Sequence, residues 1–349
     1  MMEATLMQEG GGQFQPRRGS VSQSENTGVE IRLSVAIVAV KADEPRVLIV
    51  KNDSSGDDHI GALPSGAFSP FEHGSLAASL RNWVLSQTGL SLGYAEQLST
   101  HVDRSALVEN ENPDARAISI GYLALARATP EAELRSGEWK SWYDYLPWED
   151  WRHGRPDVIA SVIEPSLRQW AMRTPSSATS TPSTGRLDHA RMAFGLDSAA
   201  WDEEKALERY ELLFEAGLID EAHRNGRETQ PGQLAGLPEL GLPLLHNNRR
   251  TLATAVGRVR TKLKYRPVIF ELVDDEFTLF ELQKTVEAIL GPHLHKQNFR
   301  RLVESAGLVE LTGEVRAKTG GRPAKLYRFR REVLLERPAP GVRIKPGRM

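Results

Sequence analysis

Several features that are common in proteins are missing from this sequence. It contains no cysteine, which excludes disulfides, thiolate metal sites and cysteine nucleophiles. No apolar run approaches the roughly 18 residues that a membrane-spanning helix needs, and residues 1–20 lack the apolar segment of a secretion signal. We therefore expect a cytoplasmic protein.

Acidic residues are also missing from one helix where they would matter. Residues 63–90 read LPSGAFSPFEHGSLAASLRNWVLSQTGL, a Pro/Gly loop followed by an amphipathic helix and a Thr-Gly-Leu end. This is the arrangement of a loop and helix that bind a metal ion and a phosphate, yet the helix from Ser75 to Thr88 contains no Asp or Glu. Without carboxylates this helix cannot hold a hard divalent cation.

What is present describes a soluble protein with an uneven charge distribution. The chain has 349 residues, of which 40% are hydrophobic and 26% charged, and this length accommodates two or three domains, each with its own core. The net charge is −2, but residues 292–331 carry ten basic and three acidic residues, about +7, which leaves about −9 on the rest. A basic block on an acidic body indicates a polyanionic partner, although a solvated basic surface would have the same composition.

Composition and periodicity divide the chain into six segments. Residues 1–28 are rich in Gly, Gln and Ser and are expected to be disordered. Residues 29–172 predict an α+β domain, because β-branched runs alternate with helical patterns. Two of the runs, 31–40 and 46–50, are expected to form an antiparallel pair. The remaining segments are a Ser/Thr/Pro linker at 173–186, a helical extension at 187–247, a third domain at 248–336 and a basic tail at 337–349.

The third domain has the element order of a winged helix-turn-helix. A first helical stretch is broken near Pro267, a second helix begins at a capping box formed by Thr278 and Glu281, and a third runs from about Lys296 to Ser305. Two short strands, LVELTG and AKLYRFR, flank the loop EVRAKTGGRP. Helix, helix, turn, helix and hairpin in this order predict a DNA-binding domain.

The helix that begins near Lys296 carries side chains suited to reading bases. At helical spacing Phe299 and Val303 face the core, whereas Gln297 and Arg301 point away from it. Arg pairs with guanine, and Gln or Asn with adenine, through two hydrogen bonds in the major groove. A solvated amphipathic helix would show the same pattern, but the neighbouring elements favour DNA binding. The residues expected at the DNA are Lys296, Gln297, Asn298, Arg300 and Arg301 on the helix, and Arg316, Lys318, Gly321 and Arg322 in the wing, where cations reach phosphates.

Two clusters allow both a functional and a structural interpretation. His293 and His295 could indicate a metal ion, but no third ligand is apparent in the sequence, and we interpret the pair as a turn and helix start. The segment WKSWYDYLPWEDW holds four of the seven Trp. Its rings could stack on an adenine, but we favour a place in the core or in a dimer interface.

The loop and helix at residues 63–90 resemble the Nudix box, G-x5-E-x7-R-E-U-x-E-E-x-G-U, in which U is apolar. Gly66 and Glu72 fit its first half, and aligning TGL with its end places NWVLSQ at R-E-U-x-E-E, with two residues inserted before the helix. The resemblance implies a Nudix-like α/β/α sandwich for residues 29–172. Nudix hydrolysis depends on a cation held by those helix carboxylates, so the departure from the pattern implies that the fold is kept while the metal site and catalysis are lost.

A Nudix-like domain joined to a winged helix is the architecture of the NrtR family of transcriptional regulators. The segments KLKYRPVIFELVDDEFTLFELQKTVEAILG, HKQNFRRLVESAGLVELTG and GGRPAKLYRF resemble its terminal domain almost throughout. The chain length and the stretches YLPWEDWRHGRP and RYELLFEAGLIDEA are more similar to the related NadQ regulators, and the resemblance covers most of residues 30–335. It implies a repressor of NAD biosynthesis genes that needs no cofactor and binds an adenine nucleotide such as ATP, NAD or ADP-ribose as its effector. A palindromic double-stranded operator would require a homodimer.

The effector is expected at the loops that face the phosphates in a Nudix fold. The residues near these loops are Lys51, Asn52, Ser65, Gly66 and Arg116.

Two other classes of function are compatible with the sequence. A Nudix-type nucleotide pyrophosphohydrolase would have to use unusual metal ligands such as Asp57, Asp58 and Glu72. A protein-interaction scaffold would show no salt-dependent association with DNA.

Overall fold

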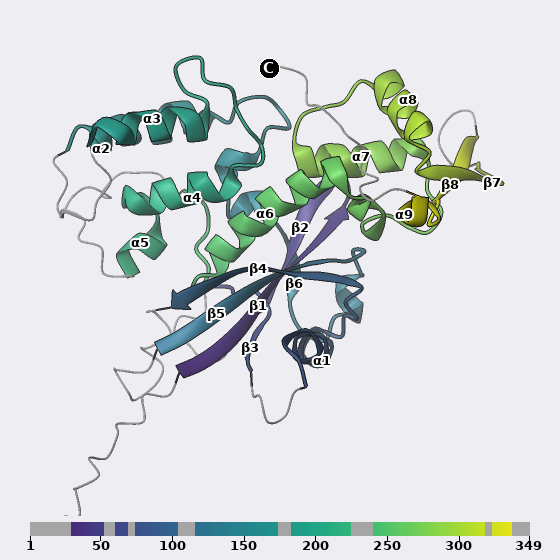
Figure 1. Ribbon diagram of the computed structural model, residues 1–349, viewed down its shortest axis with the longest axis horizontal. Coiled ribbons are helices and arrows are strands. Elements are labelled where there is room, and N and C mark those ends of the chain that lie inside the picture. The colour runs from purple at the N-terminus through teal and green to yellow at the C-terminus, as the bar shows by residue number, and fades with distance from the viewer. Residues whose placement is uncertain are drawn as a thin grey trace, which may run out of the picture.

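A computed structural model describes seven stretches of the chain (Figure 1): residues 29–51, 60–68, 74–103, 116–173, 183–224, 240–317 and 323–336. The disordered segment predicted at 1–28 and the basic tail at 337–349 lie outside these stretches, as do Asp57, Asp58 and Glu72. Within them, no helix is both long and apolar enough to cross a membrane.

A mixed six-stranded sheet forms the centre of the N-terminal part. Its strands are β1 (Val29–Lys41), β2 (Glu44–Ile49), β3 (Ser65–Ala67), β4 (Tyr94–Asp103), β5 (Arg116–Leu125) and β6 (Glu138–Ser141). The strand order is β4-β5-β1-β2-β6, with β3 paired to β1. Only β1 and β5 run parallel among the described pairs. The antiparallel pair predicted for residues 31–40 and 46–50 is confirmed, with Val38 opposite Val47.

Helix α1 (Leu76–Thr88) covers one face of the sheet. The hydroxyl of Ser75 accepts from the Ala78 amide at its start, and Gly89 ends it with a φ of 82°, a left-handed conformation that favours glycine. Leu80 and Val84 are fully buried among the side chains of β1, β2 and β5. The helix predicted at 75–88 is therefore confirmed, and its apolar face fixes it on the sheet.

The opposite face is covered by helices that come from the C-terminal part of the chain. Helix α6 (Asn248–Tyr265) packs against β1, β4 and β5, and α7 (Leu279–Leu290) packs against β1 and β2. Figure 1 shows α6 lying across the sheet, between the helical extension and the winged helix. Close packing requires small residues: a Cβ at Gly257 of α6 would lie 2.6 Å from the Glu204 carbonyl oxygen.

This packing corrects the expectation that each domain has a core of its own: the sandwich has its own cluster of buried side chains under α1, but the cluster on the other face of the sheet is shared. One cluster of buried side chains includes residues of the sheet, of the helical extension and of the winged helix, for example Val38, Leu212 and Val286. The physical reason is that α6 buries residues on several sides, so a single helix belongs to all three units. The chain is an α+β protein with a Nudix-like sandwich whose second helical layer is supplied from outside residues 29–172.

The helical extension lies beside the sandwich. Its helix α3 begins at Ser183, inside the segment predicted as a linker at 173–186, and α4 packs on α6. The elements between the sheet and α6 are the 3₁₀ helices η2 (Glu131–Glu133), η3 (Trp142–Asp144) and η4 (Pro147–Glu149), the π-helix η5 (Ile159–Ile163), and the α-helices α2 (Glu164–Ala171), α3 (Ser183–Phe194), α4 (Ala206–Glu215) and α5 (Asp220–Arg224).

The winged helix has the predicted order of elements. After α6 and the 3₁₀ helix η6 (Val268–Glu271) come α7, α8 (Lys296–Ala306), the paired strands β7 (Val309–Arg316) and β8 (Ala324–Phe329), and α9 (Val333–Glu336). The capping box of Thr278 and Glu281 is present at the start of α7. The break near Pro267 is confirmed, because α6 ends at Tyr265 and η6 follows.

A buried ionic triad joins the three units. The carboxylate of Glu149, which is 0% exposed, accepts from Arg209 of α4 at 2.6 and 2.9 Å and from Arg260 of α6. Arg260 also donates to the carbonyl of Ile289 in α7 at 3.0 Å. Burial acts to raise the pKa of Glu149, but the two guanidinium groups outweigh it, and the net shift is downward.

Buried carboxylates with lowered pKa values are expected to make the protein less stable in acid. The pKa of Glu204 and that of Glu287 are also lowered, because hydrogen bonds from Lys264 and Gln283, respectively, outweigh their burial. A carboxylate with a lowered folded pKa stabilises the protein above its unfolded pKa and loses that contribution as the pH falls through the folded value. We expect the melting temperature to be constant near neutrality and to fall below about pH 4.5, the ordinary pKa of these glutamates. Calorimetric scans from pH 7 to 3 check this, and a constant melting temperature down to pH 3 would contradict it.

Candidate functional site

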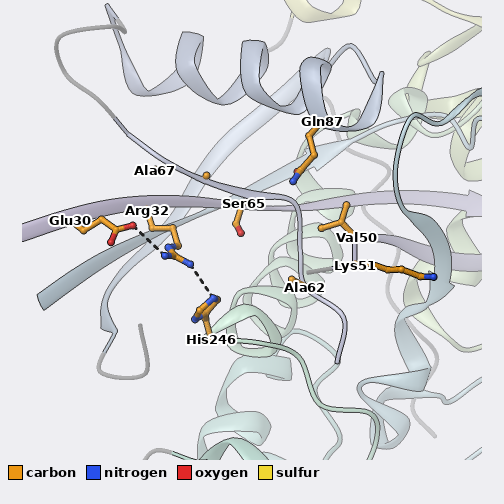
Figure 2. Close-up of a pocket in the computed structure, with 10 residues that line it drawn as sticks. Glu30, Arg32, Val50, Lys51, Ala62, Ser65, Ala67, Gln87 and His246 are labelled. Atoms are coloured by element: carbon orange, nitrogen blue, oxygen red, sulfur yellow. Dashed lines mark hydrogen bonds and ion pairs between the residues drawn. The ribbon is translucent and has the colours of Figure 1, made fainter. Parts of the chain in front are cut away.

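A cavity of about 300 Å³ opens beside the start of β1, in the Nudix-like domain. It is bounded by β1, by the segment leading into β3, by the end of α1 and by the segment that precedes α6 (Figure 2). The residues that line it are Glu30, Arg32, Val50, Lys51, Ala62, Ser65, Gly66, Ala67, Gln87 and His246.

The structure brings together three of the five residues predicted for the effector site. Lys51, Ser65 and Gly66 all line the cavity. Asn52 lies outside the described residues. Arg116 begins β5, opposite Val29. Their role in effector binding stays a prediction.

Four further polar residues of the cavity were not predicted. Glu30 and Arg32 stand two residues apart on β1 and so share one face of the strand. A polar pair at the start of an apolar run is a signal that the sequence contains. Gln87 lies in the degenerate box, where the sequence pattern marks it only as the replacement of a carboxylate. His246 comes from a segment 214 residues away from Arg32, and no sequence pattern connects the two.

The polar groups of the cavity are suited to an anion. The Arg32 guanidinium donates to Glu30 Oε1 at 3.2 Å and lies 3.0 Å from His246 Nε2, as Figure 2 shows. With Lys51, the cavity carries two permanent cations against one carboxylate. Among the described residues no group of three or more metal-binding side chains occurs. The lining can therefore receive a phosphate, which needs cations and N–H or O–H donors.

The end of α1 shows what replaces the Nudix carboxylates. Trp83, at the first of the three missing glutamates, packs on the β3 strand so closely that a Cβ at Gly66 would lie 2.2 Å from its indole nitrogen. Gln87, at the third, lines the cavity, and its side-chain oxygen is buried with no hydrogen-bond partner in the described part of the chain. The helix therefore presents an indole and an amide here in place of two carboxylates.

A larger cavity, of about 890 Å³, lies between the sheet and the winged helix. Its lining includes four carboxylates, which disfavour an anion, and two of them pair with cations of the lining, Asp275 with Arg127 and Glu96 with Lys262. We therefore place the anion site in the smaller cavity.

The tryptophan-rich segment belongs to the core. Trp139, Trp142, Trp148 and Trp151 are all buried. The interpretation as core is confirmed, and none of the four lines either cavity.

Helix α8 presents a polar surface to solvent. Phe299 and Val303 are buried, as predicted, and Gly307 ends the helix with a φ of 60°. The five residues expected at the DNA on this helix are all exposed: Lys296, Gln297, Asn298, Arg300 and Arg301. Arg300 donates to Glu304 at 2.9 Å, an exposed pair that contributes little to stability and that a phosphate can displace.

The wing is described only in part. Lys318, Gly321 and Arg322 lie outside the described residues. Arg316, at the end of β7, forms an ion pair with Glu281 of the α7 capping box and donates to the Glu276 carbonyl. Its contact with DNA stays a prediction and would require a change of partner.

The histidine pair lies between α7 and α8. His293 Nδ1 lies 3.3 Å from Glu287 Oε2, and His295 occupies the N-cap position of α8. Both positions agree with the interpretation as a turn and helix start.

Known proteins resemble this chain most clearly in its C-terminal part. Residues 269–329 match the family model of the NrtR DNA-binding winged helix domain. The ADPR responsive transcriptional repressor NtrR of Acinetobacter baylyi is 40% identical over 90 residues, which are 26% of this chain and 36% of that protein. The chain thus matches about a third of the length of this curated relative.

The likeness in fold extends much further than the likeness in sequence. The crystal structure of Shewanella oneidensis NrtR complexed with a 27mer DNA superposes with a TM-score of 0.53 and 18% identity, over 86% of this chain and 94% of that one. A second crystal structure, of Shewanella oneidensis NrtR, gives a TM-score of 0.50 over the same shares. The nearer likeness to NadQ regulators stays a prediction. The chain has the fold of NrtR over most of its length, and its C-terminal part matches the NrtR winged helix domain.

Proposed function

We propose that this protein is a transcriptional repressor. Its winged helix would bind operator DNA, and its Nudix-like domain would sense a nucleotide without hydrolysing it. The observation that carries the proposal is helix α8, which lies in a matched DNA-binding domain and exposes five residues able to contact bases and phosphates.

The DNA contact rests on the chemistry of this helix. Gln297 and Arg301 project from the side opposite the buried Phe299 and Val303, so the groups that discriminate bases are presented to a major groove. Lys296 and Arg300 add positive charge next to them, which favours phosphates. A matched solved relative is a complex with DNA. Two such helices on a palindromic operator require a two-fold symmetric homodimer, and the genes we propose as targets are those of NAD biosynthesis.

The effector assignment rests on the smaller cavity. Its volume of about 300 Å³ is at the lower end for a small-molecule site and accommodates the phosphate and sugar portion of a nucleotide. The curated relative is named as responsive to ADPR. We therefore take ADP-ribose as the probe for an adenine nucleotide effector.

The proposed lack of hydrolysis is argued from α1, the helix that carries the degenerate Nudix box. Nudix hydrolysis requires a cation to polarise the diphosphate and activate water, and Trp83, Ser86 and Gln87 occupy the positions of the required glutamates. None of the three carries a negative charge. The cavity would hold a nucleotide and leave it intact.

The proposal is tested by titrating promoter DNA of NAD biosynthesis genes in gel-shift assays. We expect a specific complex whose affinity falls steeply as the salt concentration rises, because phosphate contacts release counterions. ADP-ribose should change the operator affinity, and it should be recovered unchanged after incubation with the protein and Mg²⁺. The absence of a specific complex, or sustained formation of phosphate products, would contradict the proposal.

A further inference from the structure

The contact between Arg32 and His246 joins the effector cavity to the segment that leads into α6. Arg32 belongs to β1, whereas His246 precedes α6 by two residues. Their side chains meet at 3.0 Å inside the cavity lining. The effector site is thus partly built from the element that connects the sandwich to the winged helix.

Hydrogen-bond chemistry fixes the present state of this contact. A guanidinium group only donates, so His246 Nε2 must be the acceptor and present its lone pair to Arg32. A phosphate oxygen is also only an acceptor. A phosphate bound to Arg32 therefore competes with His246 for the guanidinium N–H groups, and where it takes the N–H that His246 now accepts, the imidazole turns or shifts.

A second group in the cavity indicates the class of ligand. Gln87 lines the cavity, and its side-chain amide can both donate and accept hydrogen bonds. A sugar hydroxyl can pair with such an amide, and Arg32, Lys51 and the hydroxyl of Ser65 line the same cavity and can donate to a phosphate. Together these groups match a sugar phosphate.

The segment that carries His246 is well placed to transmit a shift. His246 has a φ of 54°, a left-handed conformation that non-glycine residues adopt at a cost. Its neighbour Leu245 donates to the carbonyl of Gly61 at 3.1 Å, so the residue before the lining residue Ala62 holds this strained turn in place. A change at His246 therefore alters the constraint on the first turn of α6.

Helix α6 reaches from this turn to the winged helix. Its 18 residues correspond to a rod of roughly 27 Å. Near its far end Arg260 donates to the Ile289 carbonyl of α7, and α7 packs against α8. The rod is continuous from the cavity to the helix pair that is expected to hold DNA.

We propose that the phosphate group of a sugar-phosphate effector displaces His246 from Arg32, and that this exchange is the step by which α6 and the winged helix respond to occupancy. The inference rests on the proposed function and adds to it the ligand class, two ligand-binding residues, Arg32 and Gln87, and the residue that transmits the signal.

The test separates binding of the effector from the response to it, by measuring two quantities on the full chain. Calorimetry gives the Kd for ADP-ribose in the presence of EDTA, and fluorescence anisotropy gives the operator Kd with and without saturating ADP-ribose. Arg32→Gln is expected to weaken ADP-ribose binding by about 10- to 150-fold, the usual effect of losing a hydrogen bond to a charged group. His246→Ala removes the acceptor that competes for Arg32, so ADP-ribose should bind at least as tightly as to the wild type, but its effect on the operator Kd should fall to less than about a third of the wild-type ratio, as expected when a coupling contact is removed.

Two further variants control for folding and for nonspecific effects. His246→Asn keeps a residue that tolerates the left-handed conformation but is too short to reach Arg32, and it should behave as His246→Ala does. His153→Ala removes an exposed histidine elsewhere and should respond as the wild type does. If ADP-ribose changes the operator Kd of both His246 variants by the same factor as that of the wild type, this inference alone is overturned. If the wild-type protein fails to bind ADP-ribose, both the proposed effector function and this inference are contradicted.

Discussion

Replacement of Arg301 by alanine is expected to weaken specific operator binding by about 1–3 kcal/mol, or roughly 5- to 150-fold. Arg301 is exposed on α8, two helical positions before the buried Val303 and on the side opposite Phe299. A guanidinium at this place can donate two hydrogen bonds to one guanine, and alanine can replace neither of them. Fluorescence anisotropy on an operator duplex and on a scrambled duplex, at one fixed salt concentration, measures the effect.

Base reading and phosphate binding give different results in this assay. If Arg301 reads a base, affinity falls on the operator and hardly changes on the scrambled duplex. Lys296→Ala, which removes an expected phosphate contact, should instead weaken both duplexes and reduce the slope of log K against log salt by about one. Arg135→Ala removes an exposed arginine of the Nudix-like domain and serves as the matched control. Equal losses on both duplexes for Arg301→Ala would contradict a base-reading role.

The parts of the fold that the sequence predicted well are those determined by local interactions. Thr278 and Glu281 define the start of α7 because a capping box needs only four consecutive residues. The orientation of α8 follows from the spacing of Phe299 and Val303, since one apolar stripe leaves one possible buried face. The same reasoning applies to Ser75 and Gly89, which bound α1.

The parts that were missed depend on packing between distant segments. The apolar residues of α6 indicate burial but do not say against what, and the second layer of the sandwich was therefore not expected from residues 248–265. The pairing of Arg32 with His246 spans 214 positions. Lys51, Ser65 and Gly66, which line one cavity, could be grouped from the sequence because a loop before a helix can be recognised locally. The groups that complete it came from β1 and from the segment before α6, whose places only the tertiary structure defines.

The second large effect is expected from Glu149→Gln, which we predict to lower the free energy of unfolding by about 3–5 kcal/mol. The substitution preserves shape but removes the negative charge between Arg209 and Arg260, which are 0% and 1% exposed. Two guanidinium groups would then remain buried without a counter-charge, and the cost of their desolvation is no longer offset. Urea unfolding followed by tryptophan fluorescence suits this measurement, because the Arg209 guanidinium lies 3.7 Å from the centre of the Trp201 ring. Glu131→Gln makes the same chemical change at an exposed position and should leave the urea midpoint unchanged.

The same experiment distinguishes a shared core from separate domains. Glu149 follows the sheet, Arg209 belongs to the helical extension, and Arg260 contacts both Glu149 and the α7 carbonyl of Ile289. If the three units depend on one core, Glu149→Gln lowers the urea midpoint of the whole molecule, and operator binding is lost at the same urea concentration as the tryptophan signal. If the winged helix were stable alone, operator binding would persist after that signal had changed. We expect operator binding and the tryptophan signal to be lost together, because α6 packs both on the sheet of the sandwich and on α7 of the winged helix.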